Sequence, residues 1–233
     1  MEHFNLIIKN ATICTMDADM RVIQNGYVAV KGSDIATIAE GQVPGGITAD
    51  KIVDASGQVL FPGFIDTHTH IFQSFLKGLG ADHRLIEWLN RSALPYGALM
   101  TPYQHCLAAQ LTCMEALRSG CTTLCEFFYT DQDPELADGC IAGMEDTGIR
   151  SVFIRTFQDR GEDYGMPSCM IQPADKAIEE VSRLRKVYSN RGDMLNIWTG
   201  PDVTWSTSKE GYKTMLDYCL SENVRYAMHI DET

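Results

Sequence analysis

Two histidines separated by one residue end an apolar segment, the run Phe-Pro-Gly-Phe-Ile-Asp-Thr-His-Thr-His over residues 61–70. In an extended strand, residues i and i+2 point to the same face, so His68 and His70 are expected to present two imidazoles side by side. A third histidine, His229, lies at the end of a second strand-like segment, and Glu232 follows it three residues later. Two strand ends therefore offer three imidazoles and a carboxylate.

This combination of residue types predicts a catalytic metal site. Three neutral imidazoles that leave one coordination position open suit a divalent metal. Such a metal lowers the pKa of its bound water to about 7 and so supplies hydroxide as a nucleophile. Glu232 is the candidate for moving protons between that water and a substrate. Asp231 is a poorer candidate, because strand alternation places it on the opposite face from Glu232.

The elements that must position these residues change in character along the chain. Residues 1–57 show short β-branched or alternating runs separated by turn sequences such as Asn25-Gly26, which predicts a small β domain. From residue 58 onward, strand and helix patterns alternate. The strand candidates are 58–66, 121–128, 150–157, 195–200 and 225–230, and the helix candidates are 101–119, 133–148, 173–188 and 207–221.

The alternating order implies parallel strands joined by right-handed crossovers. Five such strands could form an open doubly wound sheet or part of a (β/α)8 barrel, and in both the chemistry lies at the carboxyl ends of the strands. Candidate ligands after the first and the fifth strands favour the barrel. We therefore predict an α/β fold in which residues 58–233 form strands 1–5 of a TIM-type barrel, preceded by a small β-sandwich domain.

Composition excludes several other classes of protein. The net charge of −12 argues against nucleic acid as a partner and disfavours anionic membranes. No apolar run approaches the length of a membrane span, and no secretory signal is evident. The eight cysteines form no C-x-x-C pair and are expected to be reduced, in a cytoplasmic protein.

The motifs also resemble those of a known family. The run Pro62–His70 resembles the first-strand motif of the amidohydrolase superfamily, and His229-x-x-Glu232 resembles the fifth-strand motif of its aminohydrolase branch. Residues 73–89, 118–123 and 197–201 resemble the group that contains atrazine chlorohydrolase, melamine deaminase, and adenosylhomocysteine and 8-oxoguanine deaminases. The resemblance covers nearly the whole chain.

The resemblance implies roles for particular residues. His68, His70 and His229 would be metal ligands, and Glu232 would be the catalytic proton shuttle. Gln73 and Trp88, in the long loop after the first barrel strand, match positions near the substrate pocket.

One further candidate and the metal count come from other strand ends. Glu126 ends the second barrel strand and is expected to face the barrel mouth, where it would contact substrate or support the site; a purely structural role is the alternative. Binuclear members of the family carry a modified lysine at the end of strand four, where this chain has Thr199-Gly200-Pro201-Asp202. One divalent metal is therefore expected, zinc first, with iron as the alternative.

The resemblance also implies that part of the site lies elsewhere. The family completes its site with a histidine on strand six and an aspartate on strand eight, and this chain reaches strand five. We therefore expect this chain to be the N-terminal portion of an enzyme and to be inactive without the missing C-terminal half. The complete protein is expected to form a homo-oligomer.

The predicted function is hydrolytic removal of an amino group, or a halide, from a nitrogen heterocycle such as a purine, a pterin or an s-triazine, by attack of metal-bound hydroxide. Two alternatives stay open. One is a ring-amide hydrolase of the imidazolonepropionase or hydantoinase type, which the Gln73 and Trp88 loop pattern disfavours. The other is an inactive fragment that needs a complementary chain. The heterocycle and its leaving group are not determined by the sequence.

Overall fold

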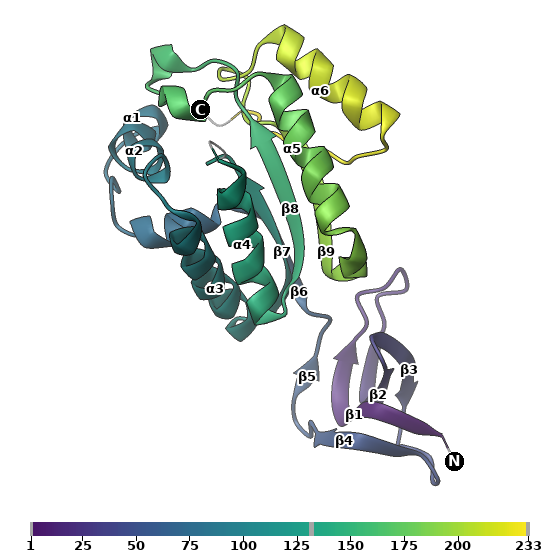
Figure 1. The fold of residues 1–233 in the computed structure, drawn as a ribbon. Coiled ribbons are helices and arrows are strands. Elements are labelled where there is room, and N and C mark those ends of the chain that lie inside the picture. Colours follow the sequence, from purple (N-terminus) through teal and green to yellow (C-terminus); the bar gives the residue numbers. More distant parts are fainter. Residues whose placement is uncertain (1, 131–132, 232–233) are drawn as a thin grey trace. The chain divides into compact units, whose positions relative to one another are not determined.

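The computed structural model describes residues 2–130 and 133–231, and the chain divides into two compact units, residues 1–63 and residues 64–233. The first unit is a mixed β-sheet, and the second is a parallel sheet with helices (Figure 1). Glu232, the candidate proton shuttle after the fifth expected barrel strand, lies outside the described residues.

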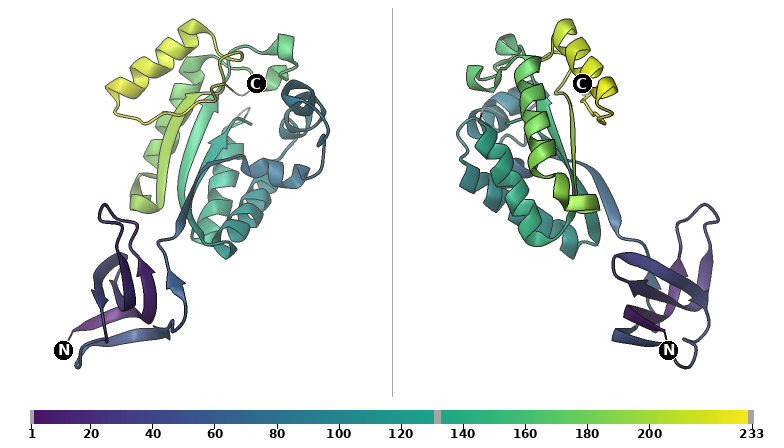
Figure 2. Two further views of the ribbon diagram at one scale, coloured as in Figure 1. Left: turned by 180° about the vertical axis from the view of Figure 1, so that it is seen from behind. Right: turned by 45° about the vertical axis from the view of Figure 1, so that its right-hand side comes forward.

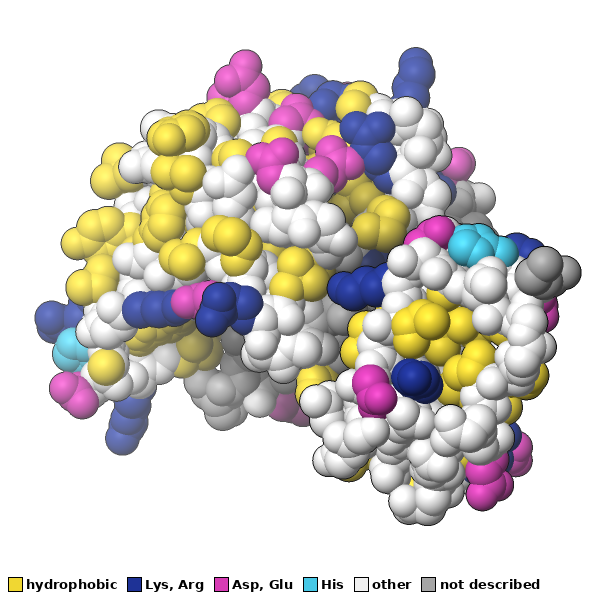
Figure 3. All heavy atoms as spheres, turned by 90° about the horizontal axis from the view of Figure 1, so that it is seen from below, with side chains coloured by type: hydrophobic (Ala, Val, Ile, Leu, Met, Phe, Trp, Pro, Cys, Tyr) yellow, Lys and Arg dark blue, Asp and Glu magenta, His cyan; other side chains and the backbone are white. Residues whose placement is uncertain are grey.

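The first unit is built from five strands: β1 (His3–Cys14), β2 (Val22–Lys31), β3 (Asp34–Glu40), β4 (Thr48–Asp54) and β5 (Val59–Leu60). β2 pairs antiparallel with β1 and β3, whereas β4 and β5 pair parallel with β1. Neighbouring residues Val28 and Ala29 belong to different buried clusters, as expected where both faces of a strand are covered. In Figure 3, hydrophobic side chains lie in a hollow within this unit.

The second unit contains a four-stranded parallel sheet in the order β6-β7-β8-β9. Its strands are β6 (Phe64–Thr69), β7 (Cys121–Phe128), β8 (Arg150–Phe157) and β9 (Leu195–Pro201). Because all four strands run in the same direction, their carboxyl ends meet at one edge of the sheet, where the candidate ligands were expected.

Helical segments connect these strands. The α-helices are α1 (Leu85–Arg91), α2 (Ala93–Gly97), α3 (Pro102–Arg118), α4 (Pro134–Thr147), α5 (Ala174–Val187) and α6 (Lys209–Ser221). The 3-10 helices are η1 (Ile71–Leu76), η2 (Glu162–Tyr164), η3 (Ser168–Met170) and η4 (Ser189–Met194). Helices α3, α4 and α5 lie along one face of the parallel sheet (Figures 1 and 2). No helix in the described ranges has the length and apolar character needed to cross a membrane.

Strand alternation divides the buried side chains of β7 between the two faces of the sheet. Leu124 and Phe128 pack with residues of α3 and α4 in one hydrophobic cluster. Cys125 and Phe127 pack on the opposite face, in a second cluster that includes Phe72 of η1. This division decides which β7 side chains can reach the candidate ligands at the carboxyl ends of the strands.

The helix boundaries follow the capping signals of the sequence. Thr101 and Gln104 form a capping box at the start of α3, and Gly148, with φ 71°, ends α4. The expected helix over residues 207–221 begins after Ser208, its N-cap, whose hydroxyl accepts a hydrogen bond from the Gly211 N–H at 2.9 Å.

The expected strand over residues 225–230 is only partly formed. It makes two isolated parallel bridges with the end of β9, Thr199 to Tyr226 and Val203 to His229. The backbone N–H of His229 donates to the Asp202 carbonyl at 2.9 Å, which ties this segment to the chain that follows β9. The segment therefore still delivers His229 to the carboxyl edge of the sheet, although it lacks a continuous ladder.

Candidate functional site

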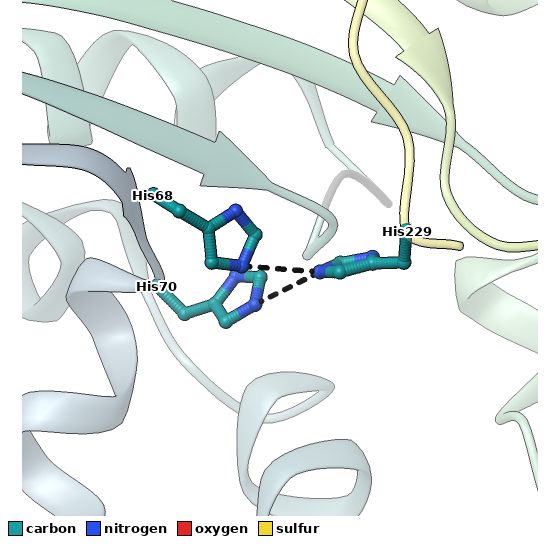
Figure 4. A group of neighbouring side chains, drawn as sticks. All are labelled: His68, His70 and His229. Atoms are coloured by element: carbon teal, nitrogen blue, oxygen red, sulfur yellow. Dashed lines mark hydrogen bonds between the residues drawn. The ribbon is translucent and has the colours of Figure 1, made fainter. Parts of the chain in front are cut away.

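The three predicted histidines converge, although 161 residues separate His68 from His229. His68 lies near the end of β6, His70 follows that strand directly, and His229 comes from the segment after α6 (Figure 4). The Nε2 atom of His229 lies 3.3 Å from Nε2 of His68 and 3.3 Å from Nε2 of His70. One ligand nitrogen from each residue lies within 4.8 Å of the others.

These separations match the geometry of a metal site. A tetrahedral zinc ion with Zn–N bonds of about 2.0–2.1 Å holds two ligand nitrogens about 3.3 Å apart. The histidine pairs that involve His229 have this spacing. The arrangement can therefore accept one ion between the three rings without a large movement of any ring.

The hydrogen bonds on the far side of two rings indicate which nitrogen carries the proton. Nδ1 of His70 lies 2.8 Å from the Phe127 carbonyl oxygen, and Nδ1 of His229 lies 3.1 Å from the Asp202 carbonyl oxygen. A carbonyl only accepts, so each Nδ1 donates and each Nε2 is left with a lone pair. Two lone pairs that face each other at 3.3 Å repel unless a cation lies between them. The donor set thus fits a metal ion.

Removal from solvent favours the neutral form of the histidine rings, most of all for the half-buried His70. The pKa of His70 is lowered to about 3, mainly by burial and to a smaller extent by the neighbouring His229 and His68 rings, against the Phe127 hydrogen bond, which raises it. Burial is also the main cause of the lowered pKa of His68, followed by His229. A metal competes with protons for these nitrogens, and a lowered pKa removes that competition at neutral pH.

Backbone contacts fix the strand end that carries two of the ligands. The Asp66 carboxylate accepts hydrogen bonds from the His68 backbone N–H and from the Thr69 hydroxyl, both at 3.2 Å. Past His70, the Ile71 N–H donates to Glu126 at 2.7 Å. These contacts hold the chain where β6 passes into η1, and so they fix the direction of both imidazoles.

The histidines open onto a pocket of about 190 Å³ at this edge of the sheet. Gln73 and Trp88, predicted from the sequence, both line it, and Gln73 donates from Nε2 to the Tyr129 hydroxyl at 2.9 Å. The other lining residues are Leu85, Leu89, Leu94, Tyr129, Met166, Asp202, Val203 and Trp205. Most of this wall is apolar or aromatic, with few polar groups beside the histidines.

The expectation that Glu126 faces the barrel mouth is wrong. Glu126 shares its face of β7 with Leu124 and Phe128, and this face packs against α3 and α4. The residue is fully buried and does not belong to the pocket lining. Burial raises the pKa of its carboxyl well above the usual value, against the Ile71 hydrogen bond.

The sequence places two acidic residues, Asp231 and Glu232, shortly after His229. Glu232 lies outside the described residues, so its predicted role stays a prediction. Asp231 adopts φ 56°, so strand alternation does not extend through it. Sequence reasoning missed Asp202, Trp205, Met166 and Tyr129 as pocket residues; Asp202 and Tyr129 could have been found, because each follows the end of a parallel strand.

Comparison with known proteins places this geometry in context. A family model described as the Amidohydrolase family matches residues 59–233. A protein from Bacillus cereus named 5-methylthioadenosine/S-adenosylhomocysteine deaminase is 29% identical over 227 residues, which cover 96% of this chain and 49% of that protein. The chain therefore spans about half the length of the curated relatives it matches.

Solved structures share the fold. The atrazine chlorohydrolase from Arthrobacter aurescens, complexed with zinc, superimposes with a TM-score of 0.84 at 20% identity, over 97% of this chain and 53% of that one. The guanine deaminase from C. acetobutylicum, with bound guanine, gives 0.83 at 17% identity over the same shares of the two chains. The likeness confirms the predicted α/β fold, with this chain corresponding to about half of the barrel proteins it resembles.

Proposed function

Because the chain belongs to the amidohydrolase family, we propose that it forms part of a metal-dependent hydrolase that removes an amino group, or a halide, from a nitrogen heterocycle. A purine, a pterin or an s-triazine would be such a substrate. The observation that carries this proposal is the convergence of three Nε2 atoms at one edge of the parallel sheet, beside an aromatic pocket.

The proposal assigns one divalent metal, with zinc as the first choice, to His68, His70 and His229. Support comes from the 3.3 Å spacing of the Nε2 atoms and from the neutral state of the buried ring of His70. The chlorohydrolase that shares this fold was crystallised with zinc. When bound, such a metal would activate a water molecule as the nucleophile.

Glu232 is proposed as the group that moves protons in the reaction. It follows His229 by three residues, in a stretch that directly continues the segment tied to β9. A carboxyl near the nucleophile can accept a proton from water and deliver it to the ring nitrogen of the substrate, so that the leaving group departs.

The pocket is proposed to bind a flat ring. Trp88, Tyr129 and Trp205 offer aromatic faces, and Met166 adds a polarisable wall. Gln73 presents an amide that can recognise a polar edge of the ring, with its orientation set by Tyr129. Small-molecule sites commonly combine such apolar walls with a few placed polar groups. The remaining site groups would come from polypeptide that corresponds to the other half of the longer relatives.

The test uses the complete protein that contains this chain, purified without chelators. Its metal content is measured, and it is assayed with aminopurines, methylthioadenosine, S-adenosylhomocysteine, pterins and chloro- and amino-s-triazines for release of ammonia or chloride. We expect about one metal per chain and turnover of at least one of these heterocycles.

The matched variants are His68→Ala and His3→Ala. His68→Ala removes a proposed ligand and should abolish both metal retention and turnover. His3 is an exposed histidine of the first unit that contacts Thr48 and Asp50, so His3→Ala should change neither. Two metals per site, or full turnover by His68→Ala, would overturn the proposal.

A further inference from the structure

The carboxyl group of Asp202 lies directly behind one of the three histidines. Its Oδ1 atom is 3.3 Å from Nδ1 of His229, on the side of the ring opposite to the converging Nε2 atoms. Asp202 follows the last residue of β9 and is 6% exposed. It is therefore a buried acidic group in contact with the Nδ1 side of the imidazole.

The loop around Asp202 fixes its position. The Asp202 N–H donates to the Phe157 carbonyl at 2.9 Å, which continues the pairing of β8 with β9. The Ser206 hydroxyl lies 3.4 Å from Oδ2 of Asp202, and Ser206 is itself fully buried. These contacts hold the carboxylate against the imidazole without help from the rest of the pocket.

The charge of Asp202 lacks a full partner among the described residues. No lysine or arginine within residues 2–130 and 133–231 forms an ion pair with it, and the basic side chain beside it is that of His229. A buried carboxylate is costly unless it is paired with positive charge and hydrogen-bonded. The Ser206 hydroxyl supplies a hydrogen bond, and a neutral imidazole beside the carboxylate supplies no charge. A cation bound at Nε2, on the other side of the same imidazole, would supply the positive charge that pairs with the Asp202 carboxylate.

His70 and His229 differ in the groups that face Nδ1. Nδ1 of His70 faces a backbone carbonyl, Phe127 O, which carries no net charge. His229 has both a carbonyl, at 3.1 Å, and a carboxylate, at 3.3 Å, at its Nδ1. The carbonyl selects the Nδ1–H tautomer, which leaves the lone pair of the ring on Nε2, and the carboxylate adds negative charge beside the ring.

We infer that Asp202 is a positioning residue that acts through His229, holding its Nδ1–H tautomer and using its negative charge to strengthen metal binding at Nε2. The inference rests on the proposed metal site and goes beyond it, because it assigns the pocket carboxylate to the metal rather than to the substrate. Loss of the carboxylate partner of a metal-bound histidine lowers the affinity of the site for its metal by about 10–100-fold.

The test is a zinc titration of the complete protein in competition with a chromophoric chelator. Asp202→Asn is nearly isosteric and retains an oxygen that can accept from Nδ1, but it removes the charge. We expect it to weaken zinc binding about 10–100-fold. Asp202→Ala removes the carboxylate and its hydrogen bonds, so it should weaken binding at least as much. It also serves as the second variant if Asp202→Asn does not fold.

The matched control is Asp159→Asn. Asp159 is a partly buried aspartate in a neighbouring loop that accepts from Ser208 N–H at 2.6 Å and does not line the pocket. This variant should lower the unfolding midpoint but leave zinc affinity unchanged. As a second readout, ¹⁵N NMR of histidine-labelled protein should report the Nδ1–H tautomer for His229 in the wild type.

The outcomes separate the two proposals. Zinc binding by Asp202→Asn and Asp202→Ala that equals the wild type would overturn this inference alone, since the backbone carbonyl would then suffice to orient His229. A wild-type protein that binds no zinc would overturn the proposed function together with the inference. Weaker binding in both Asp202 variants, with the control unchanged, supports the inference.

Discussion

Glu126 accepts a hydrogen bond from the backbone N–H of Ile71 at 2.7 Å, so a fully buried carboxyl on β7 holds the turn that directly follows His70. Its second oxygen has no hydrogen-bond partner among the described residues. A buried carboxyl with so few partners is more stable in its neutral form. Consistent with this, burial raises its pKa well above the usual value.

Replacement of Glu126 should therefore have effects that depend on pH. Between the unfolded pKa, about 4.3, and the raised folded pKa, the native state retains a proton that the unfolded state has lost. The free energy of unfolding of the wild type then falls as pH rises, by up to about 1.4 kcal/mol per pH unit. Glu126→Gln has no proton to lose, so its stability should rise relative to the wild type over this range.

The measurement is chemical denaturation from pH 4.5 to pH 8, with the exposed Glu40→Gln as the control that should run parallel to the wild type. Glu126→Ala leaves the Ile71 N–H without its acceptor and should be less stable than Glu126→Gln by about 1–3 kcal/mol at every pH, because neither variant titrates at this position. An unchanged difference between wild type and Glu126→Gln across the range would contradict a buried neutral carboxyl.

The metal-free protein should lose stability as the solution becomes acidic, in part through His70. Burial lowers the folded pKa of His70 to about 3, whereas an unfolded histidine has a pKa of about 6.5. Between these values the unfolded state binds a proton that the native state does not. The contribution of His70 is therefore complete above the unfolded pKa and is lost as pH falls toward the folded pKa.

His70→Gln should show a shallower decline than the wild type between pH 6.5 and pH 3, by up to about 1.4 kcal/mol per pH unit. Thermal or chemical unfolding in the presence of a chelator measures this, with His3→Gln as the control. Equal slopes for wild type and His70→Gln would show that His70 is not buried in its neutral form.

Glu232→Gln should separate metal binding from catalysis. Glutamine has a similar shape but cannot accept and deliver a proton, so the proposed shuttle is lost while the three histidines are intact. We expect unchanged metal content and a rate reduced about 10²–10⁴-fold. Metal analysis and turnover of the same preparation provide the measurement, with Asp231→Asn as the neighbouring control. Near-normal turnover by Glu232→Gln would exclude the assigned role.

Gly143→Ala should destabilise the second unit through the contact between two helices. Gly143 lies on α4, and an added methyl group would meet the Cys106 carbonyl oxygen and the Ala109 side chain on α3. Backbone atoms cannot move aside without shifting a helix, so we expect a loss of about 1–3 kcal/mol or more. Gly45→Ala, where the added methyl group meets open space, is the control in an unfolding titration. Equal stability of the two variants would show that α3 and α4 do not pack so closely.

The sequence by itself determined most local features of this protein. The i, i+2 spacing placed His68 and His70 together, and their rings lie with centroids 4.8 Å apart. Capping residues such as Thr101 and Gly148 marked helix ends, because a cap satisfies backbone groups within a few residues of itself. The alternation of strands and helices predicted the parallel sheet, because a helix between two strands returns the chain to the same end of the sheet, so that both strands run in the same direction.

Tertiary structure decided which face of each strand packs against helices and which loop residues contact the predicted histidines. Alternation assigns side chains to two faces but does not say which face packs against helices, so Glu126 was expected on the wrong side. The contact of Asp202 with His229 depends on the loop after β9 and on backbone pairing between segments far apart in the chain. Such contacts arise from packing and long-range pairing, which leave no periodic signal in the residues that make them.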